Sequence, residues 1–236
     1  MKKLLARTWK FCLKSFLLFI AITVGLVVLL RWIPVYVTPL MVIRMVEQKI
    51  DGKEMKLKKT WKPLEEISPA LQLAVVCAED KNFLKHHGFD FGAIEKAIKH
   101  NEKNKRKRGA STISQQTAKN VFLWPGRSWV RKGFEVYFTF LIETIWSKKR
   151  IMEVYLNIVE LGNGVYGAEA ASEAYFNTSA AKINKRQAAT LAIVLPSPLK
   201  YNAKHPSPYL NGRINWALQQ MRFWGGKLDY DKKGKK

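Results

Sequence analysis

An uncharged, apolar run over residues 15–30 constrains this chain more than any other feature. Apolar residues continue from it to Val37, so the segment approaches the ~20 residues that a bilayer-spanning helix requires. More positive charges precede the run than follow it directly, and those before it are Lys2, Lys3, Arg7, Lys10 and Lys14. By the positive-inside rule, residues 1–14 form a cytoplasmic tail, residues 15–37 form a single transmembrane anchor, and the rest lies outside the cytoplasm.

A cleaved signal peptide is the alternative interpretation of this run. The apolar core of a signal peptide is shorter and ends in small residues before the cleavage site. No Ala-x-Ala sequence comes directly after Leu30. The sequence therefore favours an anchor that is retained.

The charge of the chain calls for an anionic partner. The formal net charge is +23 and the pI is near 10.0, which fits nucleic acid, anionic lipid headgroups or a phosphorylated substrate. The basic run 103–108 makes nucleic acid a serious rival. An exported domain meets little nucleic acid, however, so we expect no nucleic-acid partner. Tight, salt-dependent binding to duplex DNA would contradict this expectation.

Cysteine and histidine usage argues against two other kinds of site. Cys12 and Cys77 are the two cysteines, and Cys12 lies at the edge of the anchor, so the exported domain has no disulfide partner for Cys77. The histidines lack the paired spacing of zinc ligands; they are His86, His87, His100 and His205. We therefore expect no tightly bound metal.

The exported part reads as one mainly helical domain. Residues 38–67 mix proline, glycine and lysine without a sustained period and predict a connector. Residues 68–226 predict the domain, and residues 227–236 a basic tail. Apolar periodicity and capping residues predict helices over 68–80, 91–99, 111–119, 128–146, 151–161, 184–195 and 209–224. Gly162-Asn163-Gly164 would end the fifth of these helices.

Three clusters of polar residues could carry chemistry. Glu79 and Asp80 follow an apolar helix, where one acid could serve as a base, although solvated helix-end charges are the plainer interpretation. A glycine turn opens the helix after Ser111, where free N–H groups can bind an anion, and an ordinary capped helix is the alternative. Arg131 and Glu135 lie four residues apart on one helical face, either as a surface ion pair or as part of a site.

Five ordered motifs connect these clusters. They are Glu-Asp-x-x-Phe-x-x-His-x-Gly at 79–88; Gly-x-Ser-Thr-Ile-x-Gln-Gln-x-x-Lys-Asn at 109–120; Arg-Lys-x-x-Glu at 131–135; Lys-Arg-Ile-Met-Glu-Val-Tyr-Leu-Asn at 149–157, followed by Gly162, Gly164 and Gly167; and Arg-Gln-Ala-Ala-Thr-Leu-Ala at 186–192, leading to Pro196. Over residues 66–202 the chain resembles the family 51 glycosyltransferases of peptidoglycan synthesis. The resemblance implies a lysozyme-like, mainly α glycosyltransferase domain behind the anchor.

The resemblance also implies a reaction and its residues. A growing glycan chain on undecaprenyl diphosphate would be transferred to the 4-hydroxyl of lipid II, giving a β-1,4 bond with inversion. Glu79 would be the general base, and Glu135 would position the donor diphosphate or stabilise charge at the anomeric carbon. The implied substrate-binding residues are Phe83, His86, Ser111, Thr112, Gln116, Lys119, Asn120, Arg131 and Lys132.

The same resemblance sets the expected partners and location. These are lipid II, the lipid-linked glycan chain, membrane lipids and other cell-wall synthases, at the bacterial inner membrane with the domain in the periplasm. No tightly bound cofactor is implied, and a loosely held Mg²⁺ or Mn²⁺ could assist at the diphosphate. The aromatic segment 122–129 would either dip into the membrane interface or pack as core.

Two activities of related proteins were weighed against this interpretation. A transpeptidase domain is not expected, because the chain stops soon after the fifth motif and lacks Lys-Thr-Gly and Ser-Asp-Asn. The chain is thus similar to monofunctional members of the family. A lytic glycosidase is the nearer rival, since a lone glutamate on a lysozyme-like fold can also cleave glycan strands, but the order of the five motifs argues against it.

Overall fold

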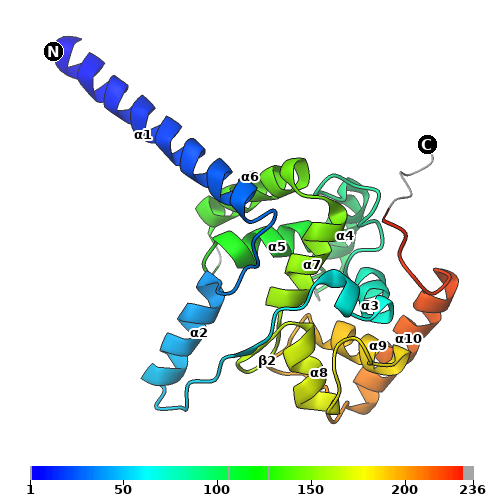
Figure 1. Cartoon of the computed structure of the whole chain (residues 1–236). Helices are drawn as coiled ribbons and strands as arrows, with labels where there is room; N and C mark the ends of the chain where they lie inside the picture. The colour runs from blue at the N-terminus through cyan, green and yellow to red at the C-terminus, as the bar shows by residue number, and fades with distance from the viewer. Residues whose placement is uncertain (1, 106, 127, 231–236) are drawn as a thin grey trace. The chain divides into compact units, whose positions relative to one another are not determined.

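A computed structural model describes residues 2–105, 107–126 and 128–230 of the 236-residue chain (Figure 1). Arg106 of the basic run, Arg127 of the aromatic segment and residues 231–236 of the predicted tail lie outside the described residues. The chain divides into two units, 1–34 and 35–236, which we describe separately.

The first unit is dominated by α1 (Lys2–Leu29), whose segment Leu5–Leu29 is long and apolar enough to cross a membrane. This helix begins and ends earlier than the predicted anchor over 15–37. After Leu29 the backbone bonds tighten to three-residue spacing, as in the bond from the Arg31 N–H to the Val28 carbonyl at 3.2 Å. Pro34 keeps the helix from continuing past this turn, because proline disfavours helical backbone at the residue before it, Ile33.

The predicted connector contains regular structure. Helix α2 (Pro39–Ile50) starts at Thr38, whose hydroxyl accepts the Met41 N–H, with proline at the first helical position. Within this helix, the side-chain amide of Gln48 donates to Asn163 at 3.1 Å, and the side-chain oxygen accepts the Lys56 N–H at 2.7 Å. The segment was predicted as irregular because the contact with Asn163, 115 residues further along, has no signal in the local sequence.

The second unit is mainly α, as predicted. Its helices follow in the order α3 (Pro69–Glu79), α4 (Phe91–Lys103), α5 (Ile113–Phe122), α6 (Trp129–Ile145), α7 (Lys148–Ile158), α8 (Ala168–Phe176), α9 (Lys185–Val194) and α10 (Pro208–Phe223), with a short 3₁₀ helix η1 (Leu64–Glu66) before them. Helix α3 packs against α9 and α10, while α5 packs against α6 and α7 (Figure 1). Residues 71–77 of α3 are all buried, so this helix lies in the core and ends at Glu79.

A small sheet closes one side of the helical unit. Its strands run in the order β1 (Lys58–Lys59), β3 (Val165–Tyr166) and β2 (Glu160–Gly162), with β1 parallel and β2 antiparallel to β3. The prediction that Gly162-Asn163-Gly164 ends a helix was therefore wrong. Helix α7 stops at Ile158 because Val159 is extended, and the glycines instead form the turn between β2 and β3.

Gly164 provides a test of this turn. Its φ is +70°, and an added Cβ would lie 2.3 Å from the Lys56 carbonyl oxygen. We expect Gly164→Ala to lower the free energy of unfolding by about 3 kcal/mol, from strained backbone and steric overlap together. Gly52 is a matched control, because its φ is +66° but nothing lies within 4 Å of the added Cβ. Gly52→Ala should cost about 1 kcal/mol in the same denaturant titration; equal losses would mean that the contact with Lys56 yields freely.

Candidate active site

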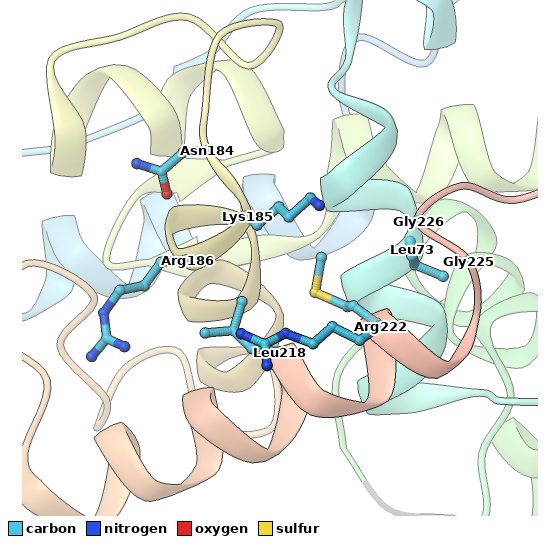
Figure 2. A pocket seen from close by; sticks show the side chains of 9 residues that line it. Leu73, Asn184, Lys185, Arg186, Leu218, Arg222, Gly225 and Gly226 are labelled. Atoms are coloured by element: carbon cyan, nitrogen blue, oxygen red, sulfur yellow. The ribbon is translucent and has the colours of Figure 1, made fainter.

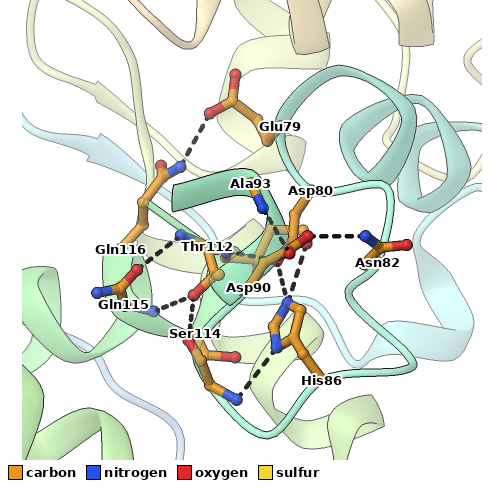
Figure 3. Close-up of polar contacts among 12 residues, drawn as sticks. Glu79, Asp80, Asn82, His86, Asp90, Ala93, Thr112, Ser114, Gln115 and Gln116 are labelled. Carbon is orange, nitrogen blue, oxygen red and sulfur yellow. Dashed lines mark hydrogen bonds and ion pairs between the residues drawn. The ribbon is translucent and has the colours of Figure 1, made fainter. Parts of the chain in front are cut away.

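Glu79 is the last residue of α3, and its carboxylate faces the Gln116 side chain of α5 (Figure 3). The Gln116 amide donates to Glu79 Oε2 at 2.9 Å, and the Tyr155 hydroxyl donates to Gln116 Oε1 at 3.1 Å. Desolvation by burial raises the pKa of the Glu79 carboxyl, while the Gln116 bond and nearby positive charges oppose the rise. Such a carboxyl is tuned toward the pH range in which it can both take and release a proton.

Asp80 has a different task from its neighbour. It is 6% exposed, and its carboxylate accepts from His86 Nε2 at 2.9 Å and from the Ile113 N–H at 3.0 Å. The His86 ring is fixed from its other side, where Nδ1 accepts the Gly88 N–H at 3.1 Å (Figure 3). The interpretation of Glu79 and Asp80 as solvated helix-end charges was therefore wrong for Asp80, which anchors the start of α5.

The start of α5 is not open to a substrate anion in the way predicted. Thr112 is buried and forms a capping box with Gln115, and its hydroxyl donates to the Gly88 carbonyl at 2.6 Å. Asp80 takes the Ile113 N–H, so an internal carboxylate occupies the place that a phosphate would need. Thr112 thus has a structural task, while Ser111, one residue earlier, is exposed.

Glu135 lies at the centre of a cationic cluster on α6. Its side chain is buried, with Oε2 2.9 Å from Arg131 Nη1 and Oε1 2.5 Å from Lys132 Nζ. Burial lowers the pKa of the nearby Lys119, and Glu135 opposes that effect. The alternative of a routine surface pair does not describe Glu135, because its own side chain is almost without solvent contact.

Lys119 links the two acids. The charge of Glu135 and, more weakly, that of Glu79 both act on its ammonium group. The positive charge of Lys119 in turn lowers the pKa of Glu79. The structure therefore brings the predicted base and the predicted second glutamate to one lysine on α5.

Three other predicted substrate-binding residues, Phe83, His86 and Asn120, have side chains that are taken up by packing or by hydrogen bonds within the protein. Phe83 is fully buried, with its ring 4.7 Å from Lys148 Nζ, so it packs beneath the site instead of lining it as expected. His86 is likewise taken up by Asp80 and Gly88, and Asn120 is buried on α5. Burial of these side chains follows from contacts between elements, which the motif pattern alone does not reveal.

Sequence reasoning assigned no role to two residues that act on the site. Tyr155 holds the Gln116 amide that bonds Glu79, and it stood in the fourth motif without a task. The charge of Arg213 on α10 lowers the pKa of Glu79. Arg213 lies outside all five motifs, so no local signal pointed to it.

A metal-binding cluster or a cavity elsewhere in the described part of the chain could form an alternative active site. No group of three His, Cys, Asp or Glu side chains that could hold a metal ion occurs among the described residues. A cavity of about 690 Å³ lies between α3, α9 and α10, with Leu73, Lys185 and Arg222 among the residues around it (Figure 2). None of the predicted site residues lines this cavity, and no acid does.

The chain is similar to known proteins over most of its length. A family model described as Transglycosylase matches residues 46–222. A protein of Bacteroides thetaiotaomicron is 59% identical over 203 residues, covering 86% of this chain and 82% of the relative. A protein of Bdellovibrio bacteriovorus is 57% identical over 212 residues, covering 90% and 85%. One of Pseudomonas aeruginosa is 51% identical over 213 residues, covering 90% and 92%. All three carry the name biosynthetic peptidoglycan transglycosylase.

Proposed function

Because this chain belongs to the transglycosylase family, it polymerises the glycan strands of peptidoglycan from lipid II, and we propose that Glu79 is its general base. The observation that carries this assignment is the partly buried Glu79 carboxylate, hydrogen-bonded by Gln116 and influenced by Lys119. Glu79 takes the proton of the acceptor sugar 4-hydroxyl, and the oxygen of that hydroxyl bonds to the anomeric carbon of the donor. The bond from that carbon to the diphosphate breaks, and undecaprenyl diphosphate leaves with the electron pair.

The leaving diphosphate needs positive charge more than a proton. Lys119, Arg131 and Lys132 supply it, because charge-assisted bonds to phosphate oxygens stabilise the departing anion. Both oxygens of Glu135 bind cations, so this acid is unsuited to be a second base and instead fixes the directions of Arg131 and Lys132. Ser111, directly before the cap of α5, is exposed, and its hydroxyl adds a hydrogen-bond donor for the diphosphate. A divalent ion on the diphosphate would add to the same charge.

The membrane setting follows from the substrates, whose polyprenyl tails stay in the bilayer. Helix α1 is the anchor, with its basic end in the cytoplasm and the catalytic unit on the outer face of the inner membrane. Trp129 is 92% exposed and Trp124 is also exposed, which favours contact with the lipid interface. Phe122 stacks on Phe138 at 4.4 Å and Leu123 is buried, so these two belong to the packing. Other cell-wall synthases would meet the protein at this surface of the membrane.

Assays with two different substrates distinguish glycan polymerisation from cleavage of finished glycan strands. The purified full chain, incubated with lipid II in detergent, should build glycan strands that gel electrophoresis resolves. Incubated with intact sacculi, it should release no muropeptides. Muropeptide release without strand growth would replace the proposed function with a glycosidase that cleaves finished strands.

The hydrogen bond from Gln116 predicts a change in pH dependence. A base acts when deprotonated, so kcat/KM should fall as the pH drops through the pKa of Glu79, which burial has raised. The Gln116 amide stabilises the charged carboxylate, and Gln116→Leu should therefore move the acidic limb of the profile to higher pH by about one unit. Tyr155→Phe, which only loosens the Gln116 amide, should move it less in the same direction. A limb that stays in place in both variants would argue that another group titrates.

A further inference from the structure

Two cations outside the Glu135 cluster lie on the indole ring of Trp216. Lys81 Nζ is 5.1 Å from the ring centroid and Arg213 Cζ is 5.7 Å from it. Lys81 follows Asp80 in the turn after α3, and Arg213 and Trp216 are one turn apart on α10. Lys81 Nζ also donates to the Gln220 side chain on α10 at 2.8 Å. Helix α10 therefore holds both cations beside the end of the helix that carries Glu79.

Neither of these two cations is held in a direct ion pair among the described residues, whereas Arg131 and Lys132 both pair with Glu135. A cation–π contact positions a cation without cancelling its charge or using its N–H donors. The arrangement thus leaves an oriented guanidinium and ammonium available to an external anion.

The position of Lys81 and Arg213 near Glu79 indicates which anionic substrate they could bind. Arg213 acts on the Glu79 carboxylate, so it lies near the base. Lys119, which also acts on Glu79, belongs with the α6 cluster, because the charges of Glu135, Arg131 and Lys132 act on its ammonium group. Glu79 therefore borders two separate groups of cations. The reaction brings together two anionic substrates, the donor chain and lipid II, and the α6 cluster can serve the donor diphosphate.

We propose that Lys81 and Arg213, held in place by Trp216, bind an oxyanion of the acceptor lipid II while Glu79 deprotonates its sugar hydroxyl. The proposal rests on the proposed function, since it names the binding partner of the same site. The oxyanion is either the diphosphate or a carboxylate of the stem peptide, because a guanidinium and an ammonium bind both groups by charge-assisted hydrogen bonds. Binding here would aim the acceptor hydroxyl at Glu79.

The test measures initial rates of the full chain with a preformed lipid-linked glycan as saturating donor and lipid II varied. Arg213→Gln should raise the KM for lipid II about fivefold with kcat changed less than about twofold, the effect expected for one charge-assisted contact in a partly solvated site. Arg213→Lys keeps the charge and should restore part of the loss. Lys81→Gln should also raise the KM. Arg222→Gln removes an exposed cation from the same helix and should leave both constants unchanged.

A second acceptor identifies the source of the oxyanion. If the KM effect of Arg213→Gln disappears with lipid II whose stem carboxylates are amidated, the cations bind the peptide; if the effect persists, they bind the diphosphate. An unchanged KM, or a fall in kcat alone, would overturn the proposal and leave Arg213 with an effect only on the charge of Glu79. Glu79→Gln is assayed in parallel, because activity in that variant would refute Glu79 as the base, whereas the KM effects of Arg213 and Lys81 test acceptor binding separately.

Discussion

Replacing Glu79 with Gln is expected to reduce strand polymerisation by about a thousandfold or more, within the range that a general base contributes. The amide keeps the shape of the side chain and its place beside Gln116 but cannot accept a proton. The measurement is the initial rate of lipid II consumption by the purified full chain. Activity within tenfold of the unmodified protein would contradict the assignment of the base.

The same variant should not lose stability, which separates a catalytic effect from unfolding. Burial raises the pKa of Glu79 above its value in the unfolded chain, so keeping the carboxylate charged at neutral pH costs folding free energy. The neutral amide removes this cost, and the midpoint of thermal unfolding should stay the same or rise. Glu173→Gln, at an exposed position of α8, is the matched control and should change neither activity nor stability.

Local signals in the sequence predicted the helices of the second unit well. A helix was expected from residue 91, and the carboxylate of Asp90 directly before it accepts the Ala93 N–H at 2.8 Å. Ser128 likewise starts α6, with its hydroxyl accepting the Arg131 N–H. Caps and apolar periodicity act within a few residues, so a single sequence is sufficient to place them. The end of α3 at Glu79 follows from the same kind of signal.

The predictions that failed depended on remote contacts. The sequence left open whether the start of α5 binds an anion or is an ordinary capped helix, and it is capped, with Asp80 from a different element accepting the Ile113 N–H. Helix α2 and strand β1 are regular because Gln48 bonds Asn163 and β1 pairs with β3. Arg213 comes to Glu79 only through the packing of α10 on α3. No spacing along the chain encodes such contacts, so the sequence places the two acids on their helices but does not show which side chains surround them.

The second large effect is expected for Glu135→Gln, which should lower kcat by about a hundredfold or more, as expected for the loss of preorganised charge at a leaving group. The carboxylate binds Arg131 through one oxygen and Lys132 through the other, so it fixes two cations in one geometry. An amide can accept from only one side and donates from the other, which turns at least one cation away. The loss of negative charge also favours neutral Lys119, whose pKa burial already lowers.

Stability must be measured beside activity here, because removing one partner of a buried ion pair costs about 3–5 kcal/mol. Glu143 is the matched control: it lies two turns further along α6, is similarly buried and pairs with Lys148 at 2.6 Å. Glu143→Gln should lower the unfolding midpoint to a similar degree while kcat falls by less than about tenfold, since Lys148 does not belong to the diphosphate cluster. If both variants lose activity in proportion to stability, Glu135 only supports the fold. If Glu135→Gln alone loses turnover while still folded, its charge acts on the reaction by holding Arg131 and Lys132 where the diphosphate departs.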